Sequence, residues 1–199
     1  MNFLAHAFLS PNDDEWMVGN LLGDFVKGRK QLDQLPQNIQ KGVLLHRKID
    51  EFTDTHPLVK KGVQRLRPHH DRYAAVVIDI LYDYFLAKNW STYSSISIND
   101  FSQSVYKALE PQLIHFPPKV IRQFQTMINS NWLVQYQDTE RLQWVFERLE
   151  KRVRFEANFK NAVRNMQHSE AAFDEEFNGF FPAVLNFKHQ QLRYLEKPA

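Results

Sequence analysis

Apolar residues recur every three to four positions along most of the chain, which is the spacing of amphipathic helices. Runs that alternate apolar and polar residues, as half-buried strands do, are nearly absent, and the 199 residues include only six glycines. The pattern therefore predicts an all-α protein, folded as a single-domain, multi-helix bundle over residues 1–199. We expect helices at residues 3–9, 13–27, 36–53, 57–67, 71–90, 98–110, 118–129, 139–151 and 170–195, with a loop at 91–99.

One predicted helix is apolar on almost every side. It contains the run AAVVIDILYDYFLAK, residues 74–88, and should therefore lie in the core. Asp79 and Asp83 are its two acidic residues, and their spacing of four places both carboxylates on one face. A buried carboxylate without a partner is strongly unfavourable, so each must be protonated, hydrogen-bonded, ion-paired or bound to a metal.

The same pattern of a polar group among apolar neighbours occurs at four other positions. They are His6 in NFLAHAFL, Asp24 in VGNLLGDFV, and His46 with Asp50 in GVLLHRKID. His46, Asp50 and Asp54 follow at steps of four on one helix face, although Asp54, near the helix end, is more typical of a solvated or capping residue. Two imidazoles with several carboxylates suit a divalent cation such as manganese, iron, zinc or magnesium. A chain without cysteine favours the harder of these ions.

A cation in such a pocket would polarise a phosphoryl oxygen and lower the pKa of a bound water, which is the chemistry of phosphoester hydrolysis. Arg47 lies beside His46 on a different helix face, and its guanidinium is suited to contact a phosphate. Three basic residues that follow Asp24 are expected at the mouth of the pocket: Lys27, Arg29 and Lys30.

The buried acids and histidines could instead have a purely structural role. Asp79 and Asp83 could form ion pairs with Arg47 or Lys48, as buried acids in helical cores do. A single histidine among apolar residues, such as His6, is commonly a packed core residue. In that case the protein would be a helical binding module without catalytic activity.

Composition excludes several classes of function. The chain has 25 Lys and Arg against 23 Asp and Glu, a net charge of +2, which gives no indication of nucleic-acid binding. The absence of cysteine excludes disulfides, thiolate zinc sites and a cysteine nucleophile. The apolar stretch at residues 3–9 is too short for a signal peptide or a membrane span. We therefore expect a soluble, cytoplasmic protein that binds neither nucleic acid nor membranes.

Aromatic residues elsewhere predict packing rather than ligand binding. We expect the last helix to bury a stripe formed by Phe173, Phe177, Phe180, Phe181 and Phe187. We expect the same of Trp132, Tyr136 and Trp144.

Several of these segments together resemble one known family. The order and spacing of MNFLAHAFLS, GNLLGDFVKG, LLHRKIDEFTD and VVIDILYDYFLAKNW resemble the acyl carrier protein phosphodiesterase family, and NWLVQYQD (131–138) and FNGFFP (177–182) extend the similarity over almost the whole chain. The resemblance implies a bacterial cytoplasmic enzyme that hydrolyses the phosphodiester between 4′-phosphopantetheine and the serine of holo acyl carrier protein, giving the apo protein. It also implies Mn²⁺ as the metal, with Mg²⁺ or Fe²⁺ as alternatives, and distant kinship with the all-helical HD phosphohydrolases.

The resemblance also implies the site residues. The matching positions are His6, Asp24, His46, Asp50, Asp79 and Asp83. Unlike ordinary HD enzymes, this chain has Arg47 rather than aspartate directly after His46. We expect the metal ligands to be His6, Asp24, His46 and Asp79.

Other residues have expected roles around that metal. Asp50 and Asp83 should orient ligands or water, and Arg47 should stabilise the charge that develops on the phosphate. The carrier protein is acidic, so basic residues should steer it to the site: Lys27, Arg29, Lys30 and Lys48. The alternative activity at the same site is hydrolysis of nucleotide or alarmone phosphates, as in other HD-type proteins.

Overall fold

The structure is a computed structural model that describes residues 1–150 and 158–195. Every regular element in these two ranges is helical, so the predicted all-α class is confirmed. The α-helices are α1 (Phe3–Phe8), α2 (Asp14–Leu22), α3 (Gly28–Leu32), α4 (Gln37–Thr55), α5 (Pro57–His70), α6 (Ala74–Lys88), α7 (Trp90–Tyr93), α8 (Ile98–Leu109), α9 (Pro118–Asn129), α10 (Trp132–Gln135), α11 (Thr139–Glu150), α12 (Ala162–Gln167) and α13 (Glu170–Leu195). Short 3₁₀ helices are η1 (Asp71–Tyr73), η2 (Glu110–His115) and η3 (Phe159–Asn161).

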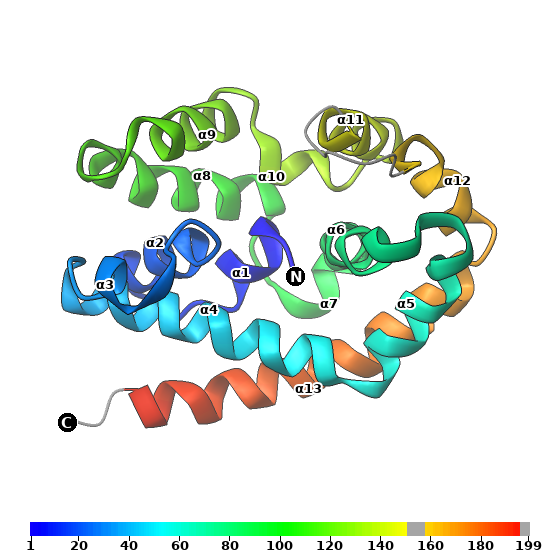
Figure 1. Cartoon of the computed structure of the whole chain (residues 1–199), viewed down its shortest axis with the longest axis horizontal. Helices are drawn as coiled ribbons and strands as arrows, with labels where there is room; N and C mark the ends of the chain where they lie inside the picture. Colours follow the sequence, from blue (N-terminus) through cyan, green and yellow to red (C-terminus); the bar gives the residue numbers. More distant parts are fainter. Residues whose placement is uncertain (151–157, 196–199) are drawn as a thin grey trace.

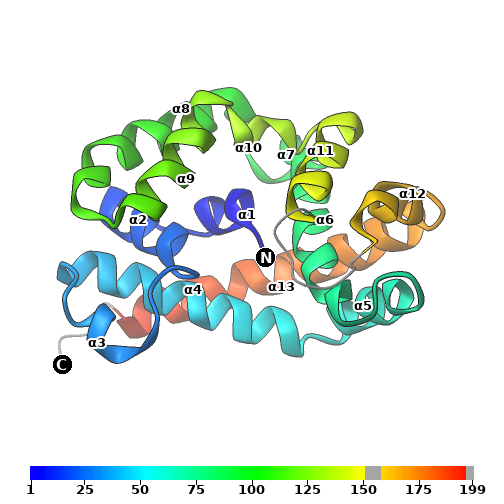
Figure 2. The same ribbon diagram turned by 45° about the horizontal axis from the view of Figure 1, so that its top comes forward.

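The short helix α1 lies in the middle of the molecule, and the longer helices surround it. Figures 1 and 2 show α8 and α9 on one side of α1 and the long helices α4 and α13 on the other. Helix α1 contacts α2 and α6, while α13 packs along α4 and α5. The first residues of the chain are therefore placed between α4 and α6, the two helices that carry most of the candidate site residues.

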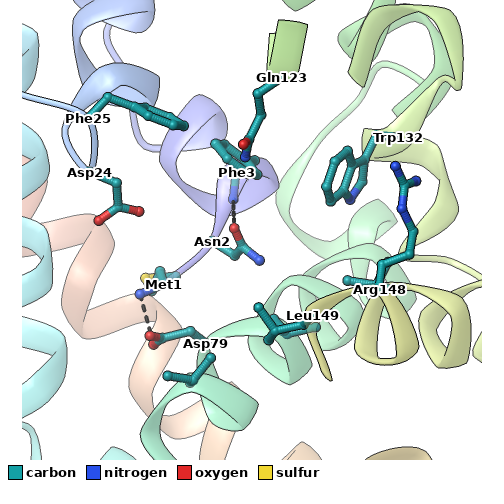
Figure 3. A pocket seen from close by; sticks show the side chains of 13 residues that line it. Met1, Asn2, Phe3, Asp24, Phe25, Asp79, Gln123, Trp132, Arg148 and Leu149 are labelled. Atoms are coloured by element: carbon teal, nitrogen blue, oxygen red, sulfur yellow. Dashed lines mark hydrogen bonds and ion pairs between the residues drawn. The ribbon is translucent and has the colours of Figure 1, made fainter. Parts of the chain in front are cut away.

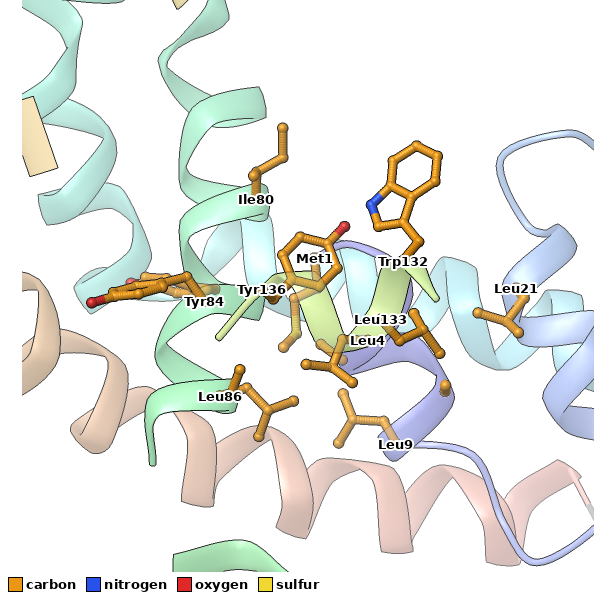
Figure 4. Close-up of a cluster of buried hydrophobic side chains, with 14 of the residues drawn as sticks. Met1, Leu4, Leu9, Leu21, Ile80, Tyr84, Leu86, Trp132, Leu133 and Tyr136 are labelled. Atoms are coloured by element: carbon orange, nitrogen blue, oxygen red, sulfur yellow. The ribbon is translucent and has the colours of Figure 1, made fainter. Parts of the chain in front are cut away.

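The buried hydrophobic residues form one contiguous core around α1 and α6. Figure 4 shows Leu4 and Leu9 of the first segment packed near Leu86 of α6 and Leu133 of α10. Leu4, Leu9 and Leu133 are fully buried. Burying a leucine side chain contributes about 1.5–3 kcal/mol, so a few such contacts are enough to hold a helix of only six residues.

Two glycines allow α2 and α4 to pack closely. A Cβ atom on Gly19 would lie 2.1 Å from the carbonyl oxygen of Ile39, and one on Gly42 would lie 2.1 Å from that of Trp16. Any larger residue at either position would force the helices apart. The close crossing brings the last turn of α2 against the middle of α4, where His46 is located.

Several helix boundaries differ from the sequence prediction. The helix predicted for 13–27 ends at Leu22, where the chain enters a turn at residues 23–25; Gly28, with a φ of 71°, then begins the separate helix α3. The helix predicted for 57–67 continues to His70 despite Pro68 in its last turn. The segment predicted as a loop at 91–99 begins with the end of α7, and α3, α10 and α12 were not predicted.

The aromatic predictions are confirmed for most residues. Four phenylalanines of the last helix are completely buried: Phe173, Phe177, Phe180 and Phe181. Phe187 is half-buried and stacks on Phe52 with ring centroids 4.4 Å apart. Trp132 and Tyr136 are buried, but the prediction for Trp144 was wrong. Trp144 is 67% exposed, because α11 turns Leu142, Val145 and Phe146 to the core instead.

Within the described ranges, no helix has the length and apolar character needed to cross a membrane.

Candidate functional site

Two histidines and one aspartate from two different helices meet at the centre of the molecule. The rings of His6 (α1) and His46 (α4) stack with their centroids 3.9 Å apart. Both Nε2 atoms face the carboxylate of Asp50, one turn after His46: His6 Nε2 lies 3.1 Å from Oδ1 and His46 Nε2 lies 3.0 Å from Oδ2. The histidines are buried, and the Asp50 side chain is 35% exposed. Among the described residues, these three form the one cluster of His, Cys, Asp or Glu whose ligand atoms lie within 4.8 Å of one another.

Asn20, which sequence reasoning missed, fixes the orientation of both rings. It is fully buried in the last part of α2, and its amide nitrogen donates to the backbone oxygen of His6 at 2.8 Å and to Ser10 Oγ at 3.0 Å. Its side-chain oxygen therefore faces His6 Nδ1 at 2.9 Å, and its backbone oxygen faces His46 Nδ1 at 2.7 Å. The signal in the sequence was an asparagine among apolar residues, one turn before Asp24.

Burial and the close packing of charges shift the pKa values of this cluster in opposite directions. Burial, reinforced by the neighbouring His46, lowers the pKa of His6 to about 4. Burial also disfavours the charged form of His46, but the neighbouring carboxylates of Asp24 and Asp50 outweigh it and raise the pKa of His46 to about 9. For Asp50 the cost of burial is likewise outweighed by hydrogen bonds from His46 and His6, which hold its pKa well below the usual range.

Gly23 allows the chain to bring Asp24 to the edge of the cluster. A Cβ atom on Gly23 would lie 2.0 Å from the ring of His46, so only glycine lets the turn after α2 approach the imidazole so closely. Asp24 Oδ1 then lies 3.8 Å from His46 Nε2, with its side chain 71% exposed. The nearby His46 imidazole lowers the pKa of Asp24. Asp24 is thus the solvent-facing member of the group.

Asp79 lies next to this cluster but has a different partner. Its Oδ1 atom is 2.9 Å from the amino group of Met1, which is also 3.5 Å from Asp50 Oδ1. Figure 3 shows this contact below Asn2. The acids nearby raise the pKa of the Met1 amino group to about 11, although burial alone would lower it. The Met1 ammonium group thus lies between Asp79 and Asp50. The structure does not place Asp79 with the histidines.

Asp83 lies on the same face of α6 but accepts hydrogen bonds from the backbone. Its carboxylate accepts from the N–H groups of Leu4 at 2.8 Å, Ala5 at 3.2 Å and Asn2 at 3.3 Å. These are the unpaired donors at the start of α1, and a carboxylate there also interacts favourably with the helix dipole. Asp83 is completely buried, and burial raises its pKa to about 7. Its contacts anchor α1 to α6.

The predicted basic residues lie outside the cluster. The Arg47 guanidinium donates to the backbone oxygen of Val26 at 3.0 Å, so it holds the segment that carries Asp24. The four basic residues expected to contact the partner are exposed: Lys27, Arg29, Lys30 and Lys48. Arg29 pairs with Asp33 at 3.6 Å, and Lys48 pairs with Glu51 at 2.9 Å. The structural alternative, in which Arg47 or Lys48 neutralises Asp79 and Asp83, is not what the structure contains.

A cleft of about 410 Å³ opens beside the cluster. Asn2, Phe3 and Asp24 line this cleft and also border a gap at His6 and His46 that is too narrow to hold a water molecule. Figure 3 shows Asp24 and Phe25 on one side of the cleft, with Trp132, Arg148 and Leu149 on the opposite side. The two histidines therefore lie just behind the wall of a space large enough for a small molecule, with Asn2, Phe3 and Asp24 between them and the cleft.

Comparison with known proteins identifies the family. The sequence profile of the acyl carrier protein phosphodiesterase family matches residues 1–184. The chain belongs to this family. The family expected from the sequence motifs is therefore confirmed, and with it the expected phosphodiesterase class.

Curated members of the acyl carrier protein phosphodiesterase family align along almost their whole length. The protein of that name from Photorhabdus laumondii is 30% identical over 186 residues, 93% of each chain. The one from Klebsiella pneumoniae is 30% identical over 187 residues, 93% of this chain and 96% of its own, and the one from Yersinia pestis is 29% identical over 194 residues, 96% and 100%. No solved structure matches this chain significantly.

Proposed function

We propose that this protein hydrolyses the phosphodiester between 4′-phosphopantetheine and the serine of holo acyl carrier protein, giving the apo protein. Membership of the acyl carrier protein phosphodiesterase family supports this activity. We further propose that His6, His46 and Asp50, with Asp24 at the edge, hold a divalent cation, with Mn²⁺ as the expected ion. The location in the cytoplasm remains part of the same prediction, since it follows from the family resemblance.

One observation carries the metal proposal: in each histidine, an oxygen atom faces each of the two ring nitrogens. The Nδ1 atoms face the two oxygens of Asn20, so each Nδ1 must carry a hydrogen and donate it. Each Nε2 then presents a lone pair to the Asp50 carboxylate if the ring is neutral. Two lone pairs facing each other at about 3 Å repel unless a positive charge lies between them.

In the metal-free protein a proton on His46 can supply that positive charge for one ring, because the pKa of His46 is about 9, but not for His6. Protonating both rings would stack two cations with centroids 3.9 Å apart, and burial already keeps the pKa of His6 near 4. Hence His6 is neutral at pH 7, and its Nε2 lone pair points at Asp50. A cation shared by the two Nε2 atoms and the carboxylate would satisfy all three groups, and hydrogen bonds from Nδ1 to a fixed oxygen are the usual support of a histidine ligand.

The donor set also suits the proposed ion. Imidazole nitrogens and carboxylate oxygens without thiolates fit Mn²⁺ and similar divalent cations. When bound, such a cation would polarise a phosphoryl oxygen and make a water more acidic. The exposed carboxylate of Asp24 and the half-exposed carboxylate of Asp50 lie between the histidines and solvent, where they can hold and orient a water. These assignments make Asp50 a ligand and leave Asp79 in contact with the Met1 amino group.

The direct test is incubation of the protein with holo acyl carrier protein and Mn²⁺, followed by mass measurement of the carrier. We expect loss of the phosphopantetheine group with wild-type protein and none with His46→Asn. Asp54→Asn is the matched control, because Asp54 is on the same helix one turn after Asp50 and is exposed. An unchanged carrier mass with the wild-type protein would refute the activity. A parallel panel of nucleotide and alarmone phosphates tests the alternative substrate class, and activity on none of these substrates would favour a binding module.

The acidic carrier is proposed to dock on the basic segment that follows Asp24. Arg29 and Lys30 are exposed in α3, a few residues beyond Asp24. The double variant Arg29→Glu, Lys30→Glu should raise the KM for the carrier, since charge reversal weakens electrostatic steering, and should leave hydrolysis of a small phosphodiester unchanged. Lys119→Glu with Arg122→Glu on α9 is a charge-matched control. Equal loss on both substrates would contradict docking at α3.

A further inference from the structure

The amino group of Met1 is a charged group next to the site that the proposed reaction does not use. It is fully buried, and its nitrogen lies 2.9 Å from Asp79 Oδ1 and 3.5 Å from Asp50 Oδ1 (Figure 3). The same oxygen of Asp50 faces His6 Nε2 at 3.1 Å. The Met1 ammonium is therefore connected to the proposed metal ligands through a single carboxylate oxygen.

The two carboxylates that share this ammonium come from different helices. Asp50 belongs to α4 and Asp79 to α6, and both side chains are about two-thirds buried, with 35% and 33% of their surface exposed. Among the described residues, no lysine or arginine forms an ion pair with either of them. Without the ammonium, two partly buried negative charges would face each other, which is strongly unfavourable. The amino group thus holds α4 and α6 together at the site.

The position of the amino group along the chain is fixed by the residues that follow it. The N–H groups of Asn2, Leu4 and Ala5 donate to the Asp83 carboxylate, and Met1 itself is buried in the core. One residue added before Met1 would move the free amino group by up to about 3.6 Å. The new amino group could not reach the same carboxylates unless these contacts were broken.

We propose that the unblocked ammonium of Met1 is a positioning group of the active site, which holds Asp79 and Asp50 together and so fixes Asp50 against His6 and His46. This inference rests on the function proposed above, because it treats Asp50 as a metal ligand. A peptide bond or an acyl group on the Met1 nitrogen removes the positive charge. The site is therefore complete only in a chain with a free amine at Met1. The role of Asp79 is to hold this amine.

The first experiment compares one chain before and after its amino terminus is released. A folded module is fused in front of Met1 so that a protease can cut directly before Met1; until the cut, the Met1 nitrogen is an uncharged amide. We expect kcat for holo carrier protein with Mn²⁺ to be about tenfold to a hundredfold lower before the cut than after it, the cost of a small misplacement at the reacting centre.

A control separates positioning from obstruction by the fused module. The same module is placed after Ala199, because α13 ends far from the amino terminus (Figures 1 and 2). This control should have the kcat of the released protein. A fusion before Met1 that raises only KM, with kcat unchanged, would mean that the module merely obstructs the carrier, and would overturn the proposal.

The direction of the change in Mn²⁺ affinity distinguishes positioning from simple charge neutralisation. A positive charge 3.5 Å from Asp50 Oδ1 repels a metal ion bound there, so removal of the charge alone would lower the Kd for Mn²⁺. If the ammonium positions Asp50, its loss should instead raise the Kd, by about tenfold or more, as with other groups that support a metal ligand. Titration calorimetry of the fusion and the released protein measures both values. A lower Kd before the cut would overturn the proposal.

Asp79→Asn tests the same contact in a chain with a free amino terminus, so the test does not depend on the folding of a fusion. The amide keeps the shape of the side chain and removes the charge that holds the ammonium. We expect kcat to fall about tenfold. We also expect the Met1 amine of the folded, metal-free protein to react faster with an acylating reagent, measured by the mass of the N-terminal peptide.

Asp54→Asn is the matched control for Asp79→Asn. Asp54 lies one turn after Asp50 and forms no ion pair among the described residues, so this variant should keep both the kcat and the slow acylation of the wild type. If Asp79→Asn also keeps both, or if the wild-type amine reacts as fast in the folded protein as in urea, the proposal is overturned.

These measurements separate this inference from the proposed function. If the released protein does not cleave holo carrier protein but the fusion before Met1 still raises its Kd for Mn²⁺, the activity is refuted and the positioning role stands. If the carrier is cleaved with the same kcat before and after the cut, the activity stands and the positioning role is refuted.

Discussion

Asp50 and Asp83 are two acids among apolar residues, near the same central helix α1, and yet they have opposite surroundings. Asp50 contacts two imidazoles and an amino group, and its side chain is 35% exposed. Asp83 is completely buried and accepts three backbone N–H groups from the start of α1. A buried carboxylate therefore does not by itself indicate a reactive site. What distinguishes Asp50 is that its partners are side chains that can also bind a cation.

The substitution Asp50→Asn should have the largest effect on the function of either acid. The amide keeps the shape of the side chain but removes the charge that both histidines face. Loss of a residue that only supports a metal ligand lowers activity by up to about a hundredfold. Because Asp50 is proposed as a ligand itself, we expect phosphopantetheine release to fall by more than that. Turnover of holo carrier protein with Mn²⁺ measures it. Activity within tenfold of wild type would place the reactive centre elsewhere.

Titration of His46 provides the next largest effect, on the stability of the metal-free protein. The folded protein binds the His46 proton more tightly than the unfolded chain, with a pKa of about 9 against 6.5. The stabilisation is therefore fully present below pH 6.5 and is lost as the pH rises through 9, a change on the order of 3 kcal/mol. Urea unfolding in EDTA at pH 6.5 and 9 measures it.

The His46→Asn variant isolates this contribution from that of other groups. His6, Asp24 and Asp50 all face His46, and the Met1 amino group titrates in the same alkaline range. The difference between wild type and His46→Asn should therefore shrink towards pH 9. A constant difference over that range would contradict the assigned protonation of His46.

Asp83→Asn should affect stability rather than catalysis. The amide would turn an N–H₂ group towards one or more of the three backbone donors, which leaves buried donors unpaired and costs about 1–3 kcal/mol. Urea unfolding measures the loss, and the activity of the folded fraction should stay within a few-fold of wild type. A large loss of activity without loss of stability would instead support the role first predicted for Asp83, that of orienting ligands or water.

Gly23→Ala tests the surroundings of Asp50 with the smallest change, because it adds a single methyl group beside His46. The added Cβ would lie 2.0 Å from the His46 ring, so the ring or the turn that carries Asp24 must move. A misplacement of this kind should lower activity about tenfold or more. Gly28→Ala is the control, because nothing lies within 4 Å of its position, although its φ of 71° makes alanine mildly strained there. Equal activities of the two variants would contradict the tight packing at His46.

Much of the fold and part of the site follow from the sequence. The 3.6-residue pattern predicted both ends of α9 and the start of α13, since Pro118 begins the first helix and the periodic stripe begins with the second. The approach of His6, His46, Asp50 and Asp24 was also predicted, although their binding of a cation stays a prediction.

Other features depend on tertiary contacts that no local pattern encodes. The partner of Asp79 is the amino group of Met1, and that of Asp83 is the backbone of α1, neither of which is a side chain that a motif can display. Asn20 reads as one polar residue in an apolar helix until α2 and α4 are packed together. Trp132 is predicted as a core residue, and only the folded chain places its ring in the wall of the cleft.

The central claim is that His6, His46 and Asp50 hold one divalent cation, and metal content measures it most directly. Purified protein equilibrated with Mn²⁺ and freed of excess ion should retain about one equivalent per chain. His46→Asn should retain far less, while Asp54→Asn should match the wild type. A wild-type protein without stoichiometric metal after saturation with Mn²⁺, or equal binding by wild type and His46→Asn, would contradict the claim.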